Sequence, residues 1–259
     1  MEPIVARYRQ LDAEKIIETV RALHGRIEER FPGSGLGKIV AELLRVAEET
    51  VARARWIRKP HLPLRCAAGF LSLAIIVLVA GMLISIRQYQ FNDYTNFIQA
   101  LDASISSVVF IGAAIIFFVS WEHRIKRNRA LKAIHELRAM AHIIDMHHLT
   151  KDPESCFARE PQPASTRKQI MTPLELNWYL DYCGESLALI SKIAALYVQG
   201  FQDHILLDAV DDVEDLTSHF SQKIWQKISI LENLGRSFSS RAAVGNAGGA
   251  AAADKTQAR

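Results

Sequence analysis

Histidine and aspartate side chains gather between residues 135 and 148, and their chemistry is that of metal ligands. Zinc and iron commonly take imidazole nitrogens and carboxylate oxygens as ligands from proteins. Residues three positions apart share a helix face, so Asp145 is placed to converge on one ion with His142 or His148. His135 lies two turns from His142, about 10 Å away, which is too far for a shared ion. The candidate metal ligands are therefore His142, Asp145 and His148.

The same cluster also has a structural interpretation, as polar side chains at a contact between helices. It contains no cysteine, and any further ligand would have to come from a distant part of the chain: His204, His219, Asp152 or Glu154. We therefore expect no bound cofactor, with the metal site as the alternative.

Residues 31–38 read FPGSGLGK, which has the composition of a phosphate-binding loop. The spacing is one residue shorter than G-x-x-x-x-G-K-[ST], Ile39 stands where the motif has a hydroxyl, and no strand pattern precedes it. A turn between two helices explains the same residues, with Ser34 or Gly35 starting the second helix. We interpret the segment as that turn.

Four aspartates, Asp208, Asp211, Asp212 and Asp215, fall on one helical face. Three interpretations stay open: a solvated face, a docking surface for the basic segment 124–132 or for a partner, and a divalent cation site. A Ser–His–Asp or Cys–His catalytic set cannot be placed in the sequence. The three cysteines, Cys66, Cys156 and Cys183, are scattered and form no metal-binding or disulfide pattern. We predict a protein that is not an enzyme.

The sequence also contains two apolar segments, 66–86 and 103–121, and neither segment contains a charged residue. About 20 such residues in a helix match the thickness of the hydrocarbon core of a bilayer. Neither segment shows the alternation of a β-strand. The sequence therefore predicts an all-α integral membrane protein whose two transmembrane helices form a hairpin, with helical hairpins in the cytoplasm.

Charge predicts the orientation of this hairpin. Basic residues flank both segments on one side: Arg53, Arg55, Arg58, Lys59 and Arg65 before the first, and Arg124, Lys126, Arg127 and Arg129 after the second. Short loops rich in lysine and arginine stay in the cytoplasm, so both termini should be cytoplasmic. The net charge of +3 does not indicate nucleic acid as a partner, because the positive charge lies beside the bilayer, where anionic lipid accounts for it.

Helical periodicity and breakers divide the chain into six parts. They are an N-terminal cytoplasmic helical hairpin at 1–62, a transmembrane hairpin at 63–121 with an outer loop at 87–102, a juxtamembrane helix at 122–150, a flexible linker at 151–170, a C-terminal helical hairpin at 171–235 and a disordered tail at 236–259. Asp12 should cap the first helix, and Thr172-Pro173-Leu174-Glu175 has the pattern of a capping box. We expect the last helix to end at Gly235.

The last helix carries apolar residues about 3.5 positions apart, a spacing typical of a coiled coil. This seam consists of Leu206, Val210, Val213, Phe220, Ile224, Ile228 and Leu231. Its partner is either residues 173–199 or another copy of the chain, and we predict a homo-oligomer.

Three segments, FPGSGL (31–36), HIIDMHHLTKDP (142–153) and KIWQKI (223–228), resemble those of an uncharacterised bacterial family of two-span membrane proteins, over most of residues 25–232. The resemblance implies a bacterial inner membrane location and carries over no functional residue. The architecture of paired spans between long cytoplasmic helices also resembles that of SLATT-type effectors, which are proposed to permeabilise membranes.

We therefore expect a membrane-anchored helical scaffold or regulatory protein that self-associates and binds an unidentified cytoplasmic protein. The alternatives are an oligomeric two-span pore or membrane effector, and a metal-binding sensor or enzyme that uses His142, Asp145 and His148.

Overall fold

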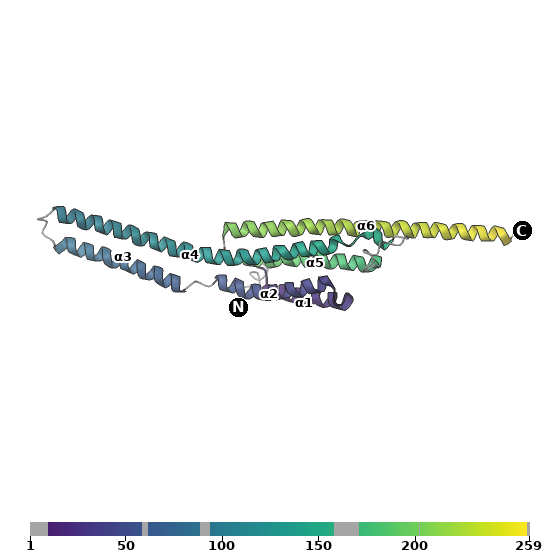
Figure 1. Ribbon diagram of the computed structural model, residues 1–259, viewed down its shortest axis with the longest axis horizontal. Helices are drawn as coiled ribbons and strands as arrows, with labels where there is room; N and C mark the ends of the chain where they lie inside the picture. Colours follow the sequence, from purple (N-terminus) through teal and green to yellow (C-terminus); the bar gives the residue numbers. More distant parts are fainter. Residues whose placement is uncertain (1–9, 59–61, 89–93, 158–170, 202, 258–259) are drawn as a thin grey trace. The chain divides into compact units, whose positions relative to one another are not determined.

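The computed structural model describes residues 10–58, 62–88, 94–157, 171–201 and 203–257, and no strand occurs among them (Figure 1). The helices are α1 (Ala13–Arg30), α2 (Gly35–Arg58), α3 (Leu62–Gln88), α4 (Tyr94–Leu149), the 3-10 helix η2 (Pro153–Cys156), α5 (Pro173–Val198) and α6 (His204–Gln257). The all-α prediction is confirmed.

The chain forms two compact units. The first consists of Met1–Ala52 and Ala133–Arg259, and the second of Arg53–Lys132. Helices α2 and α4 contribute residues to both units, whereas α1, α5 and α6 belong to the first and α3 to the second.

Local signals at the start of the first unit act as predicted. The Asp12 carboxylate accepts hydrogen bonds from the backbone N–H groups of Glu14 and Lys15 and so caps α1. A turn then follows, in which Gly33 has a φ of +68°, a left-handed value that glycine adopts without strain. The Ser34 hydroxyl accepts a hydrogen bond of 3.1 Å from the N–H of Gly37 and caps α2. The segment 31–38 is therefore a turn between helices.

Helix α5 begins with the predicted capping box. The Thr172 hydroxyl accepts a hydrogen bond of 3.2 Å from the N–H of Glu175, and the Glu175 carboxylate accepts one of 2.8 Å from the N–H of Thr172. Pro173 occupies the first turn, where its missing N–H costs nothing. Helix α5 packs against α1 and α6, and half of its 26 residues are buried.

Helix α6 covers α5 with the predicted seam. All seven seam residues are at most 6% exposed. Helix α6 packs along α5, and Phe220 of the seam also contacts His142 of α4. Within the chain, the seam therefore packs against residues 173–199, one of the two partners that the spacing allowed, and against α4.

The prediction that α6 ends at Gly235 is wrong. The helical backbone continues to Gln257, so the segment 236–257, expected to be disordered, is helical. A glycine ends a helix by adopting a left-handed conformation, but among the glycines that the structure describes only Gly33 has a positive φ. The residues that follow include many alanines, which have the highest helix propensity.

Two expected loops are shorter than predicted. Helix α4 begins at Tyr94, so residues 94–102 of the outer loop are helical; this stretch contains neither proline nor glycine. Within the linker, η2 is capped by Asp152, and its first residue, Pro153, is buried. Residues 89–93 and 158–170, which carry the rest of both predictions, lie outside the described residues.

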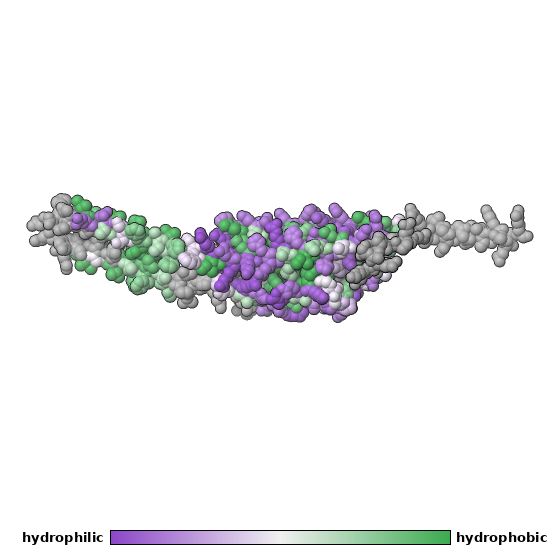
Figure 2. All heavy atoms as spheres, viewed as in Figure 1, coloured by the Kyte–Doolittle hydropathy of each residue, from purple (hydrophilic) through white to green (hydrophobic). Residues whose placement is uncertain are grey.

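The second unit has an apolar surface. By length and composition, α4 can cross a membrane, and none of its most apolar stretch is buried; the apolar helical stretch Cys66–Gly81 in α3 is shorter. Phe70 is 74% exposed and Phe110 is 76% exposed. Figure 2 shows hydrophobic residues along α3 and the first part of α4, whereas the face of the first unit seen in this view is largely hydrophilic. The described residues thus contain one helix, α4, that is both long and apolar enough over its described stretch to cross a membrane, where the sequence predicted two.

Replacing Thr172 with alanine should lower the free energy of unfolding by about 1 kcal/mol, because the first turn of α5 loses its side-chain acceptor. Urea titration of the detergent-solubilised chain measures this change. The control is Thr19→Ala in α1, where alanine is the better helix former and should cause no loss. Equal midpoints for Thr172→Ala and the unmodified chain would contradict a stabilising role for the cap.

Candidate functional site

The structure brings together only two of the three candidate metal ligands. His148 is fully buried, and its Nδ1 lies 3.4 Å from Oδ1 of Asp145. His142 is exposed, and its ring lies edge-on against Phe220, with 5.5 Å between the ring centroids. Among the described residues, no group of three or more His, Cys, Asp or Glu side chains is arranged to hold a metal ion.

A lysine from α6 closes the carbonyl end of α4 beside this histidine. Lys227 Nζ donates hydrogen bonds of 2.8 Å to the backbone oxygen of His148 and 2.9 Å to that of Lys151. The last carbonyls of a helix lack partners within the helix and carry partial negative charge, so a cation there is favourable. We call Asp145, His148, Lys151 and Lys227 the α4-end cluster.

The ring of His148 is held without hydrogen bonds. Both of its nitrogens and Oδ1 of Asp145 are buried and have no hydrogen-bond partner within the described part of the chain. Burial lowers the pKa of His148, and the positive charges of Lys227 and Lys223 lower it further, while Asp145 opposes them. Burial and the two lysines thus favour the neutral form of the ring.

The nearby thiol is not a nucleophile. Cys183 of α5 is fully buried, and burial raises its pKa to about 12, against the smaller opposing effect of Lys151 and Lys227. Because the thiolate is the reactive species, a buried and protonated thiol is inert. Burial also lowers the pKa of Lys227, and Asp152 and Asp145 oppose this effect.

Two of the segments noted in the sequence, 31–36 and 142–153, meet next to the cluster, and Lys227 comes from the third, 223–228. A Cβ atom added at Gly35 would collide with Cε1 of His147, so α2 begins directly against this ring. Lys151 lies over the Tyr179 ring, 5.3 Å from its centroid. The role of Lys227 could not be predicted, because its partners are backbone oxygens 79 and 76 residues away.

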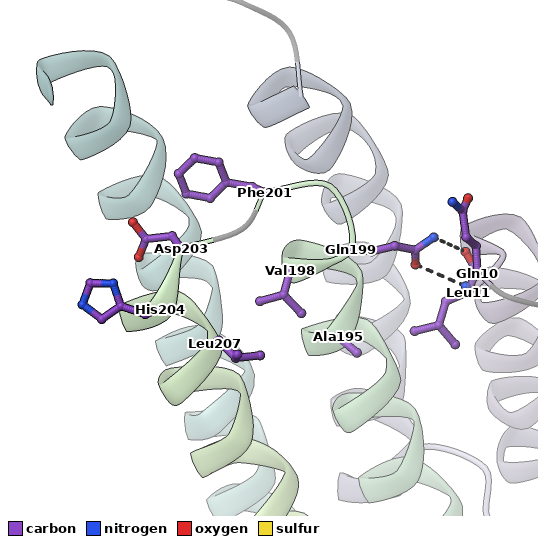
Figure 3. Close-up of a pocket in the computed structure, with 9 residues that line it drawn as sticks. All are labelled: Gln10, Leu11, Ala195, Val198, Gln199, Phe201, Asp203, His204 and Leu207. Atoms are coloured by element: carbon purple, nitrogen blue, oxygen red, sulfur yellow. Dashed lines mark hydrogen bonds between the residues drawn. The ribbon is translucent and has the colours of Figure 1, made fainter. Parts of the chain in front are cut away.

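A pocket of about 660 Å³ lies where α5 ends and α6 begins (Figure 3). Its lining is mainly apolar and includes Leu11, Val198 and Leu207. The Gln199 amide spans part of the rim, accepting a 3.2 Å hydrogen bond from the N–H of Leu11 and donating one of 3.3 Å to its carbonyl. Asp203 accepts a hydrogen bond from the N–H of Leu206 at the start of α6. The side chains of Gln199 and Asp203 thus form hydrogen bonds with the backbone beside the pocket.

The structure also describes four aspartates on one face of α6 and most of the basic residues beside the apolar segments. Asp208, Asp211, Asp212 and Asp215 are exposed, and Asp212 lies 3.6 Å from Arg138. Among the basic residues beside the apolar segments, Arg124 and Arg129 are exposed, and Arg53 and Arg127 are half-buried. Lys126 is buried in an ion pair with Glu122. Lys59 and the side chains of Arg55, Arg58 and Arg65 lie outside the described residues.

Stability should fall as the pH drops below about 6.5, the pKa of histidine in an unfolded chain. The folded state depresses the pKa of His148, so the unfolded chain binds this proton more readily. The stabilisation is therefore present above pH 6.5 and is lost as the pH falls toward the pKa of the folded state. His148→Phe removes the titrating group and should flatten the dependence of the urea midpoint on pH between 7.5 and 5.5.

His219→Phe is the matched control, because His219 is exposed on α6. It should leave the pH dependence as in the unmodified chain. An equal slope for His148→Phe and the unmodified chain would show that the buried ring does not titrate with folding.

A comparison of this chain with protein-family models, curated proteins and solved structures finds no match. Function therefore has to be inferred from the residues and their contacts.

Proposed function

We propose that this chain is an integral membrane protein in which α3 and the first part of α4 form two spans that anchor a cytoplasmic helical scaffold or regulatory domain. The observation that carries the proposal is the exposure of large apolar side chains in the second unit, among them Phe70, Val109, Phe110 and Ile116. Burying such a side chain is worth about 1.5–3 kcal/mol. Contiguous exposure on this scale favours a lipid surrounding.

The length of α3 supports a second span. Its 27 residues correspond to about 40 Å of helix, more than the roughly 30 Å of hydrocarbon in a bilayer. A hairpin of two spans returns the chain to the side from which it came. The basic residues before α3 and after the apolar part of α4 favour the same topology, with both termini in the cytoplasm. A bacterial inner membrane is the location that the sequence resemblance favours.

The proposed partner surface is the acidic face of α6. Asp208, Asp211 and Asp215 are exposed along one side of the helix, and a basic protein surface is complementary to them. Self-association has to use another surface than the seam, since the seam is already buried within the chain. The proposed homo-oligomer therefore depends on residues outside the seam.

Topology can be tested with a cysteine at position 92. In a chain with Cys66, Cys156 and Cys183 replaced by alanine, Asn92→Cys should react with a membrane-impermeant maleimide on intact cells, because the proposal places residue 92 outside. Ser218→Cys, at an exposed position of α6, should react only after the membrane is broken. The reverse pattern would sink the proposed orientation.

Vesicles containing the purified chain separate the scaffold from its two alternatives. A scaffold should leave an ion gradient intact and carry only trace metal. A pore should dissipate the gradient, and a metal sensor or enzyme should hold about one zinc or iron per chain. The sequence offers one observation against a selective pore: neither apolar segment contains a histidine or a charged residue, and such residues usually mark ion paths.

A further inference from the structure

Within the second unit, the exposed side chains of α4 change from apolar to basic over about one turn of helix. Trp121 is an exposed aromatic residue at the end of the apolar segment, and Arg124 is exposed one turn later. Residues 122–132 contain a single acid, Glu122, and five basic residues. Glu122 lies 2.8 Å from Lys126, and both side chains are about nine-tenths buried. The charge of Glu122 is therefore neutralised by Lys126. The charged residues that remain on the surface of segment 122–132 are all basic.

One arginine of this segment is held in place by an aromatic ring. The guanidinium carbon of Arg129 lies 4.1 Å from the centroid of the Trp56 ring, which links the end of α2 to α4 within the second unit. A guanidinium stacked on an indole is attracted by the ring and has fewer orientations open to it. Its N–H donors lie in its own plane, in a fork that matches two oxygens of a phosphate.

Positive charge is spread around the helix. Arg124 and Arg129 are five positions apart on α4, so they lie on different faces. A single soluble ligand binds one face, whereas bilayer lipids surround a helix on all sides. Phe117 and Trp121, which immediately precede the charges, are exposed and apolar. They can contact the acyl chains of a lipid, whereas a free anion has no apolar part for them to contact.

We propose that Arg124, Arg129 and Trp56 form a basic collar that binds the phosphate groups of anionic phospholipids, with Arg129 stacked on Trp56 as its most ordered site. The acyl chains lie along the apolar residues of α4 that precede the collar. This inference depends on the proposed function, because it places α4 in a bilayer. It adds a lipid class and the residues that select it.

The experiment uses the full chain in nanodiscs made from phosphatidylcholine and phosphatidylglycerol, with a spin label on one lipid at a time. The unmodified chain should restrict the phosphatidylglycerol probe more than the phosphatidylcholine probe. Arg129→Gln should reduce this preference by about fivefold, the effect expected for one basic residue at an anionic membrane surface. Arg129→Lys keeps the charge and loses the planar stack, so an intermediate preference is expected.

Arg236→Gln is the matched control, since it removes the same charge from an exposed position on α6 in the first unit. It should leave the preference unchanged. Inorganic phosphate should weaken the preference no more than chloride of equal ionic strength, because the collar takes a lipid phosphate rather than a free one. Equal effects of Arg129→Gln and Arg236→Gln, or no preference in the unmodified chain, would overturn the inference.

Failure of the inference and failure of the proposed function look different. If alkaline carbonate releases the chain from membranes, the proposed spans are wrong. If the chain stays in the membrane and the two lipid probes behave alike, only the collar is wrong.

Discussion

The first unit is organised around the need to cover α5 on more than one side. Half of its residues are buried, and they include Leu180, Ile190 and Ile193, whose side chains have no exposed surface. A helix that is apolar over so wide a face is stable in water only when other helices surround it. Helix α6 contributes the seam, α1 contributes the stripe from Ile16 to Ile27, and from α2 Thr50 accepts a buried hydrogen bond from Tyr197.

The α4-end cluster shows how this apolar bundle fixes its register. Apolar helix faces tolerate sliding, whereas a half-buried ammonium group that must reach two particular carbonyls does not. Lys227 meets the oxygens of His148 and Lys151 only in one alignment of α6 with α4. Moving this cation partly out of water costs free energy, and the carbonyls at the end of the helix return part of it. The contact therefore favours one alignment of the two helices over others.

Local features of the fold could be predicted from the sequence, and tertiary contacts could not. The caps at Asp12 and Thr172 depend on side chains within three residues, so their pattern in the sequence is sufficient. The end of α6 was missed because a glycine permits a left-handed conformation without requiring it, and Gly235 stays helical. His142, Asp145 and His148 have metal-ligand spacing, but α6 places the Phe220 ring against His142, which no local pattern encodes.

The two units differ in the polarity of their surfaces. In the first, apolar side chains turn inward and charged ones outward; in the second, Phe110 and Ile116 turn outward although water would penalise them. Helices α2 and α4 both contribute to both units, and the contacts between Arg129 and Trp56 and between Glu122 and Lys126 lie in the second unit close in sequence to that change. Charged groups that are stacked or paired there suit a boundary between two solvents, because each offers an apolar body and a polar end. Arg129 and Trp56 are therefore suited both to link α2 with α4 and, in the proposed bilayer, to meet the headgroup layer.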